Sequence, residues 1–312
     1  MPEVIPMTED SRSGALRKLL DEGWAYHDQE SERLARELEA AAGASVGSDF
    51  LVPFLHLSTH TIGEHLGDWA RALRLGKRVL DGRTPTFETA KGWGRLQVAA
   101  VLAGDPIEAA DLELSYLKAA GGDLGAALLD MRFMLIGALV SSKRLAEAAR
   151  LYGGTVALLE QIHSPDFLDR TIAAVSNNLG WELYEMTSRS PEMDILMGLC
   201  ADTSLKFWLK CGNWINEERA LYFRAIVSNV VGEPESALAD ADKALAVIDS
   251  QGQRPLDAAL LHLARASALA ALGDGSGKSR AIADADAAAS KLTAPDLQAQ
   301  FASERAKVLA AA

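Results

Sequence analysis

Three side chains that can bind a metal ion, His56, His60 and Glu64, lie four residues apart in a segment with helical periodicity. Positions four apart drift by only about 40° around an α-helix, so these side chains share one face. Imidazole nitrogens and carboxylates are ligands that zinc takes in proteins. The run lacks the two-histidine-plus-glutamate pattern of a metallopeptidase helix. A metal or acid–base site and packed or surface side chains are therefore both open interpretations.

The segment GDGSGKS at residues 273–279 is similar to a phosphate-binding loop. That motif has four residues between its first glycine and the Gly-Lys pair, whereas this segment has three. It also follows an expected helix, where the motif requires a strand. We interpret it as a flexible turn between helices and predict no nucleotide site.

No serine or cysteine carries a recognisable nucleophile motif, so the sequence predicts no catalytic residue. The two cysteines, Cys200 and Cys211, are eleven residues apart on one expected helix, which separates them by roughly 16 Å. A disulfide needs Cα atoms within about 7 Å, so both are expected to be free, buried or half-buried thiols.

The chain of 312 residues is 49% hydrophobic and 24% charged, and its 31 basic and 43 acidic side chains give a net charge of −12. An acidic surface repels phosphates and anionic lipids, so we expect neither nucleic acid nor a membrane as a partner. Apolar stretches such as 260–272 are interrupted by polar residues and are too short to cross a bilayer. The first residues lack a secretion-signal pattern, and we expect a cytoplasmic protein.

Alanine and leucine are abundant, and no segment alternates apolar with polar residues, so the sequence predicts an all-α fold. Residues 1–9 are expected to be a flexible N-terminus, and residues 10–312 a single domain. The expected helices cover residues 10–24, 28–42, 50–66, 68–80, 85–103, 106–120, 123–142, 144–162, 166–187, 191–211, 214–231, 234–250, 256–272, 278–291 and 295–311.

The turns between these helices recur. Turns that begin at residues 67, 104, 143 and 232 are each followed five residues later by an alanine, namely Ala72, Ala109, Ala148 and Ala237. The first three turns are 37 and 39 residues apart, which is the spacing of a helix-turn-helix repeat. Helix starts are marked by polar caps before proline, as at Asp105-Pro106 and Ser190-Pro191.

Residues 50–292 resemble the tetratricopeptide repeat family. The resemblance rests on Trp93 with Leu96, on Asn178-Leu179-Gly180, on Ala148 with Tyr152, and on the small residues after the turns. The spacings exceed the 34-residue period of the family, and several signature aromatic residues are absent, so the units are irregular. The resemblance implies a right-handed superhelical solenoid of about seven helix-turn-helix pairs, with 295–311 as a polar capping helix. Its register assigns His56 and His60 to helix packing, so we expect no metal and no cofactor.

In the resembled family the first helix of each pair lines a concave groove that holds extended peptides. Only Asn178 and Arg219 match the carboxylate clamp of the family, and Phe133 and Gly137 stand where lysine and asparagine belong. The resemblance implies that the groove is formed by Asn177, Asn178, Trp181, Tyr184, Arg219, Tyr222 and Asn229. The alternative is that Trp181, Tyr184 and Tyr222 belong to the core between helices.

We therefore expect a scaffold or adaptor module that binds a protein or peptide segment, not an enzyme. Arg219 is expected to contact an acidic or carboxylate-terminated segment. Two alternatives stay open: a regulatory sensor domain that binds a small molecule or signalling peptide, and an enzyme on a helical-repeat scaffold. The sequence identifies neither the partner nor the oligomeric state.

Overall fold

A computed structural model describes residues 9–42, 46–159, 161–162, 165–252 and 254–310. Every regular element in these residues is a helix, as the sequence predicts, and no strand occurs among them. The chain divides into two compact units, with the boundary between Ser164 and Pro165. Residues 1–8 of the expected flexible N-terminus lie outside the described residues, and Glu9 begins the first helix.

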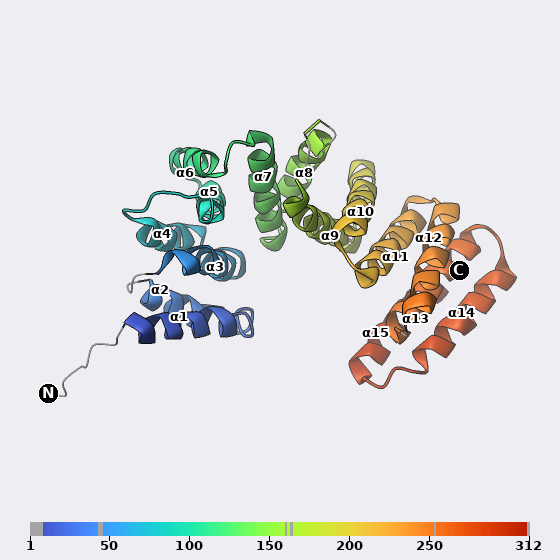
Figure 1. Cartoon of the computed structure of the whole chain (residues 1–312). Helices are drawn as coiled ribbons and strands as arrows, with labels where there is room; N and C mark the ends of the chain where they lie inside the picture. Colours follow the sequence, from blue (N-terminus) through green and yellow to red (C-terminus); the bar gives the residue numbers. More distant parts are fainter. Residues whose placement is uncertain (1–8, 43–45, 160, 163–164, 253, 311–312) are drawn as a thin grey trace. The chain divides into compact units, whose positions relative to one another are not determined.

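The first unit consists of helices that pack in sequence order (Figure 1). Its elements are α1 (Glu9–Gly23), α2 (Ser31–Ala41), α3 (Ser48–Ser58), the π-helix η1 (Thr59–His65), α4 (Trp69–Leu80), α5 (Ala90–Ala103), α6 (Pro106–Ala119), α7 (Leu124–Ser141) and α8 (Leu145–Leu159).

The second unit continues with the same kind of consecutive packing. Its elements are the short 3-10 turn η2 (Asp166–Leu168) and the helices α9 (Asp169–Glu185), α10 (Pro191–Cys211), α11 (Trp214–Val231), α12 (Pro234–Gln251), α13 (Pro255–Ala271), α14 (Gly275–Ala289) and α15 (Pro295–Ala310).

Most expected helices agree with the structure to within a few residues, and three differ for local reasons. The helix expected over 50–66 changes from α to π geometry at Thr59. The helix expected from residue 85 begins at Ala90, because Thr89 Oγ1 accepts a hydrogen bond from the Thr86 amide at 3.0 Å and holds a turn there. The turn expected at 273–279 is the capped start of α14, since Asp274 Oδ1 accepts a hydrogen bond from the Gly277 amide at 2.8 Å.

Within each unit, helices pack against chain neighbours and also against the next helix but one. α5 contacts both α3 and α7, and α13 contacts both α11 and α15. The alanines after the recurring turns are buried: Ala72, Ala148 and Ala237 are 0% exposed, and Ala109 is 5% exposed. Small side chains at these points let adjacent helices approach closely. Consecutive packing of this kind is consistent with an α-solenoid, and the handedness of the array stays a prediction.

One described helix, α7, is long and apolar enough to cross a membrane by length and composition. Just over half of it, 56%, is buried inside the protein, and a core helix passes the same test. This helix is therefore weak evidence for a membrane span.

Two glycines in neighbouring helices offer a matched test of the packing in the second unit. A Cβ atom at Gly180 in α9 would lie 2.6 Å from Phe223 Cζ, whereas a Cβ atom at Gly198 in α10 would meet no atom within 4 Å. Gly180→Ala should therefore destabilise the unit by roughly 1–3 kcal/mol, because the buried Phe223 ring must move. Gly198→Ala should stabilise it by about 0.5–1 kcal/mol through helix propensity.

Hydrogen exchange of peptides from α9 and α10, measured by mass spectrometry, reports the change in unfolding free energy of this unit for each variant. Effects of the same sign from both substitutions would contradict the close contact between Gly180 and Phe223.

Candidate binding groove

One stripe of α9 begins the candidate site. Asn177, Trp181, Tyr184 and Glu185 are spaced i, i+4, i+7 and i+8, so they project from one face of the helix. All four line a cavity of about 640 Å³ within the second unit. The other walls come from α11, α13 and α15, and α10 contributes Trp208.

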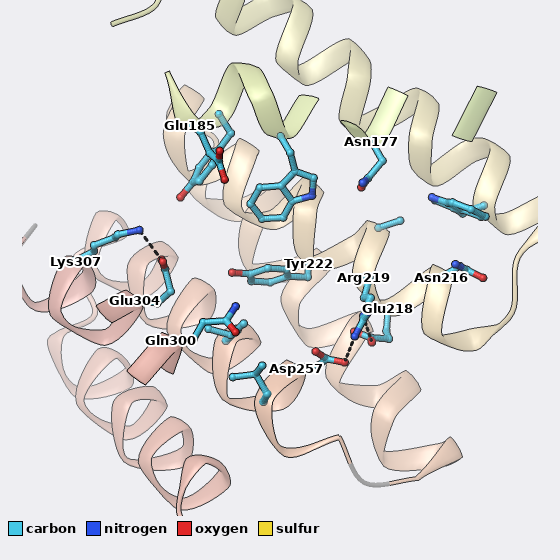
Figure 2. A pocket seen from close by; sticks show the side chains of 16 residues that line it. Asn177, Glu185, Asn216, Glu218, Arg219, Tyr222, Asp257, Gln300, Glu304 and Lys307 are labelled. Carbon is cyan, nitrogen blue, oxygen red and sulfur yellow. Dashed lines mark hydrogen bonds and ion pairs between the residues drawn. The ribbon is translucent and has the colours of Figure 1, made fainter. Parts of the chain in front are cut away.

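Figure 2 shows how the charged groups are distributed around Tyr222. Glu304 and Lys307 of α15 lie to one side of the Tyr222 ring, and Glu218, Arg219 and Asp257 lie to the other. The charged groups of the cavity thus lie on two sides of Tyr222, one formed by α15 and the other by α11 and α13.

The structure brings most of the sequence-predicted groove residues together. Five of the seven line the cavity, and these are Asn177, Trp181, Tyr184, Arg219 and Tyr222.

The other two predicted groove residues lie outside the cavity. Asn178 is about 100° around α9 from Asn177; it is exposed, and its Oδ1 accepts a hydrogen bond from Asn177 Nδ2 at 3.3 Å. Asn229 donates Nδ2 to the Ala264 carbonyl oxygen at 2.9 Å, which joins α11 to α13. Asn229 therefore contributes to the packing of α11 against α13.

Aromatic rings form one wall of the cavity. Trp181 stacks on Phe223 with ring centroids 4.9 Å apart, and it meets Tyr184 edge-on at 5.5 Å and Tyr222 at 6.3 Å. Phe223 is fully buried, whereas Trp181, Tyr184 and Tyr222 are half-buried. The sequence left open whether Trp181, Tyr184 and Tyr222 line a groove or belong to the core. In the structure these rings do both, because they pack on the core and also face the cavity.

A buried carboxylate, Glu218 of α11, stands beside Asp257 of α13 in the cavity wall. The Glu218 side chain is 0% exposed, and neither of its oxygens has a hydrogen-bond partner among the described residues. Arg254 Nε and Arg219 Nε lie 3.5 and 3.7 Å from Glu218 Oε1, which is ion-pair distance but longer than a good hydrogen bond. Burial, followed by the negative charge of Asp257, raises the pKa of Glu218 well above its ordinary value.

Arg219 lies across these two carboxylates. Its side chain is 58% exposed, and its Nη2 is 3.5 Å from Asp257 Oδ2. The sequence predicts that Arg219 contacts an acidic segment of a partner, but the guanidinium already has two carboxylate neighbours from its own chain. An acidic ligand would have to compete with Glu218 and Asp257 for this cation.

The opposite side of the cavity also carries a paired cation. Lys307 Nζ donates a hydrogen bond to Glu304 Oε1 at 2.6 Å, and this bond raises the pKa of Lys307. Burial raises the pKa of Tyr184 and of Tyr222, and the charge of Glu304 adds to both shifts, so both phenols stay neutral at physiological pH.

The cavity as a whole is acidic. Its lining includes four carboxylate side chains and two cationic side chains: Glu185, Glu218, Asp257 and Glu304 against Arg219 and Lys307. Both cations are already paired with carboxylates of this unit.

Sequence reasoning missed the contributions of α13 and α15. Leu256, Asp257 and Leu260 stand 38 residues after Glu218, Arg219 and Tyr222, so the repeat spacing carried a signal for them. Gln300, Glu304 and Lys307 of α15 also face the cavity, although the sequence predicts a polar cap there. Their i, i+4, i+7 spacing places them on one face, but only the tertiary structure shows what that face meets.

No protein-family model matches the chain, and no curated protein is significantly similar to it in sequence. Among solved structures, the chain is similar to the crystal structure of BtubC (BKLC) from P. vanneervenii. The match has 14% sequence identity and a TM-score of 0.44, and it covers 72% of this chain and 89% of that chain. At this level the likeness carries no inference about binding.

Glu218 gives the stability of the second unit a defined pH dependence. Its pKa is raised on folding from an ordinary value of 4.5, so the folded state holds the proton more tightly than the unfolded state does. Stability therefore falls as the pH rises from about 4.5 through the raised pKa. Glu218→Gln removes the buried charge and should stabilise the unit by about 1 kcal/mol at pH 8, with little effect at pH 4.

Hydrogen exchange of α11 peptides, corrected for the intrinsic exchange rate at each pH, measures this change. The matched control is Glu217→Gln at the adjacent, half-buried position, whose carboxylate pairs with Lys243 at 3.6 Å and does not line the cavity. The control should change stability by less than about 0.5 kcal/mol. A Glu218→Gln variant that is less stable than wild type at pH 8 would contradict the cost assigned to the buried charge.

Proposed function

We propose that the second unit is a binding module that holds a segment of a partner protein, with a basic side chain of that segment directed at Glu218 and Asp257. The observation that carries this proposal is the buried Glu218 carboxylate, which lacks a hydrogen-bond partner although it stands beside a second carboxylate. A buried carboxyl group with a raised pKa takes its charged form only at a cost in free energy, and Arg254 and Arg219 offset this cost from no closer than 3.5 and 3.7 Å. A ligand that brings a cation or hydrogen-bond donor would recover part of this free energy on binding.

The position of Arg219 supports the proposal of a basic ligand. Its guanidinium occupies the place that a cation of the ligand would take beside Glu218 and Asp257. It lies within 4 Å of both carboxylates but is 58% exposed, so it can move aside with little loss of packing. Glu218 and Asp257, by contrast, are held by burial at 0% and 14% side-chain exposure. Arg219 therefore acts as one internal competitor for the site, and Arg254, which donates a hydrogen bond to Asp257, is the second.

The aromatic wall supports a peptide or protein segment as the ligand. Trp181, Tyr184 and Tyr222 lie together at the cavity, and Trp and Tyr are the residues most often found at the energetic centres of interfaces. The faces of their rings also attract cations. The net charge of −12 favours encounter with a basic partner.

A regulatory sensor that binds a small molecule is the second candidate. The cavity volume of about 640 Å³ falls within the usual range for small-ligand sites, so an amine-bearing metabolite would also fit. An enzyme on this scaffold has no comparable support, because no hydrogen bond links Glu218 to a nucleophile among the described residues.

Selection of a phage-displayed random peptide library on the full chain tests the proposal. We expect enrichment of peptides with Arg or Lys beside apolar residues. Titration calorimetry with a synthetic enriched peptide should then show about tenfold weaker binding by Asp257→Asn. Trp181→Ala should lose about 2 kcal/mol, a thirtyfold loss, provided that it keeps the wild-type melting temperature. Arg219→Ala should bind about three- to tenfold more tightly, because the more exposed of the two internal cations is gone, while Arg254 still contacts both carboxylates.

Glu217→Gln and Phe167→Ala are the controls, one a neighbouring carboxylate and the other an exposed aromatic side chain, and neither lines the cavity. Both should bind like wild type. Enriched peptides that are acidic, and that Arg219→Ala binds more weakly, would contradict a basic ligand. A folded Trp181→Ala variant with unchanged affinity would place the site elsewhere.

A further inference from the structure

Three histidines of the first unit converge near its N-terminal end. His27 comes from the turn between α1 and α2, and His60 and His65 come from the π-helix η1. One ring nitrogen from each of the three lies within 4.8 Å of the others. This cluster stands in the other unit from the candidate groove, and the proposed function does not use it.

The π geometry of η1 is what brings two of these rings together. The Leu66 amide donates to the Thr61 carbonyl oxygen at 3.2 Å, which is an i→i+5 bond. Residues five apart therefore face the same way, and His60 Nε2 lies 3.1 Å from His65 Nε2. On an α-helix they would point about 140° apart. π-helical segments are rare and frequently occur at functional sites.

Two of the rings are oriented by hydrogen bonds from their second nitrogen. His60 Nδ1 lies 2.7 Å from Glu64 Oε2, and His27 Nδ1 lies 2.8 Å from the Trp24 carbonyl oxygen. Both oxygen partners are acceptors, so each Nδ1 carries the proton and each Nε2 keeps its lone pair. The lone pair of His60 Nε2 accepts a hydrogen bond from His65 Nε2, and a bound metal ion would take the place of that proton. A carboxylate or a backbone carbonyl behind the ring is the usual arrangement around a metal-ligating histidine.

We propose that His27, His60 and His65 bind a divalent transition-metal ion of the zinc class, with a fourth coordination position open to water or to a further ligand. Three imidazoles suit Zn²⁺, Cu²⁺ or Ni²⁺ better than Mg²⁺ or Ca²⁺, which prefer oxygen ligands. Ligands at about 2.05 Å in a tetrahedral site lie roughly 3.3 Å apart, close to the His60–His65 separation. The other separations are at most 4.8 Å, so binding an ion would require them to shrink by up to about 1.5 Å.

This site differs from the metal site considered from the sequence, which consisted of His56, His60 and Glu64. His56 packs its ring edge-on against Trp24 at 5.0 Å, and its centroid is 6.5 Å from that of His60. Glu64 orients His60 instead of standing as an independent ligand. The proposal therefore differs from the sequence expectation of no metal. A bound ion would link the turn before α2 to η1 and so stabilise this end of the unit.

Zinc binding by the full chain, prepared without a polyhistidine tag and freed of metal, tests the proposal. We expect about one Zn²⁺ per chain by elemental analysis, and a rise in melting temperature with added Zn²⁺. Titration against a chromophoric chelator should show at least a hundredfold weaker binding by His27→Ala and by His65→Ala. Glu64→Gln should weaken binding by about 10- to 100-fold, since Glu64 positions His60.

His262→Ala is the matched control, because His262 is a half-buried histidine of the second unit, outside the cluster. It should bind zinc like wild type. His65 is exposed, so His65→Ala is expected to keep the fold, and circular dichroism checks this. A wild-type chain that binds zinc no more tightly than folded His65→Ala would overturn the proposal, and so would an equal loss in His262→Ala.

Discussion

Each helix pair in this chain has an apolar stripe that only neighbouring helices can cover, and this constraint determines where the other features lie. Alanines such as Ala72, Ala148 and Ala237 are fully buried where helices meet, because a larger side chain would hold the helices apart. The same close packing brings alternate helices of the second unit into contact, α11 with α13 and α13 with α15. One face of each of these helices is thereby directed to a common space, and the candidate cavity lies there.

Stacking of this kind requires apolar or small residues at the contacts, and Glu218 departs from that requirement. Its carboxylate is buried without a hydrogen bond. Arg219 and Arg254 stabilise its negative charge only from ion-pair distance. A polar group kept in a buried position at a cost to stability is a common mark of a functional site. The aromatic stack of Trp181 on Phe223 next to it supplies the rigid apolar surface that a ligand would need. The proposed binding function would use both features together.

The sequence predicted the features that depend on local interactions, such as helix starts. Asp105 and Ser190 cap α6 and α10 as their side chains and the following prolines indicate, and each accepts a hydrogen bond from an amide of the first turn. The predicted stripe of α9 rested on the resemblance to the tetratricopeptide repeat, and of its residues Asn178 lies outside the cavity. The ion pair of Arg219 with Asp257 could not be predicted, because the 38-residue spacing places Asp257 at the equivalent position of another helix but does not show which side chains meet between the helices. The same limit applies to α15, whose sequence shows a polar face but not the cavity that this face completes.

The change from α3 to the π-helix η1 was hidden from the sequence for a related reason. Helical periodicity assigns His56, His60 and Glu64 to one face, and that assignment assumes 3.6 residues per turn throughout. In the structure, Gly63 lies so close to the Trp69 ring that a Cβ atom there would be 2.4 Å from it. The widened turn is thus held by packing against α4, and periodicity cannot reveal such packing. Irregular backbone geometry persists where the surrounding packing stabilises it. In η1, the π geometry brings His65, and not His56, next to His60. Each unit therefore places its candidate site at a departure from the regular repeat, a π turn in the first and a buried carboxylate in the second, and at both departures tight aromatic packing lies alongside.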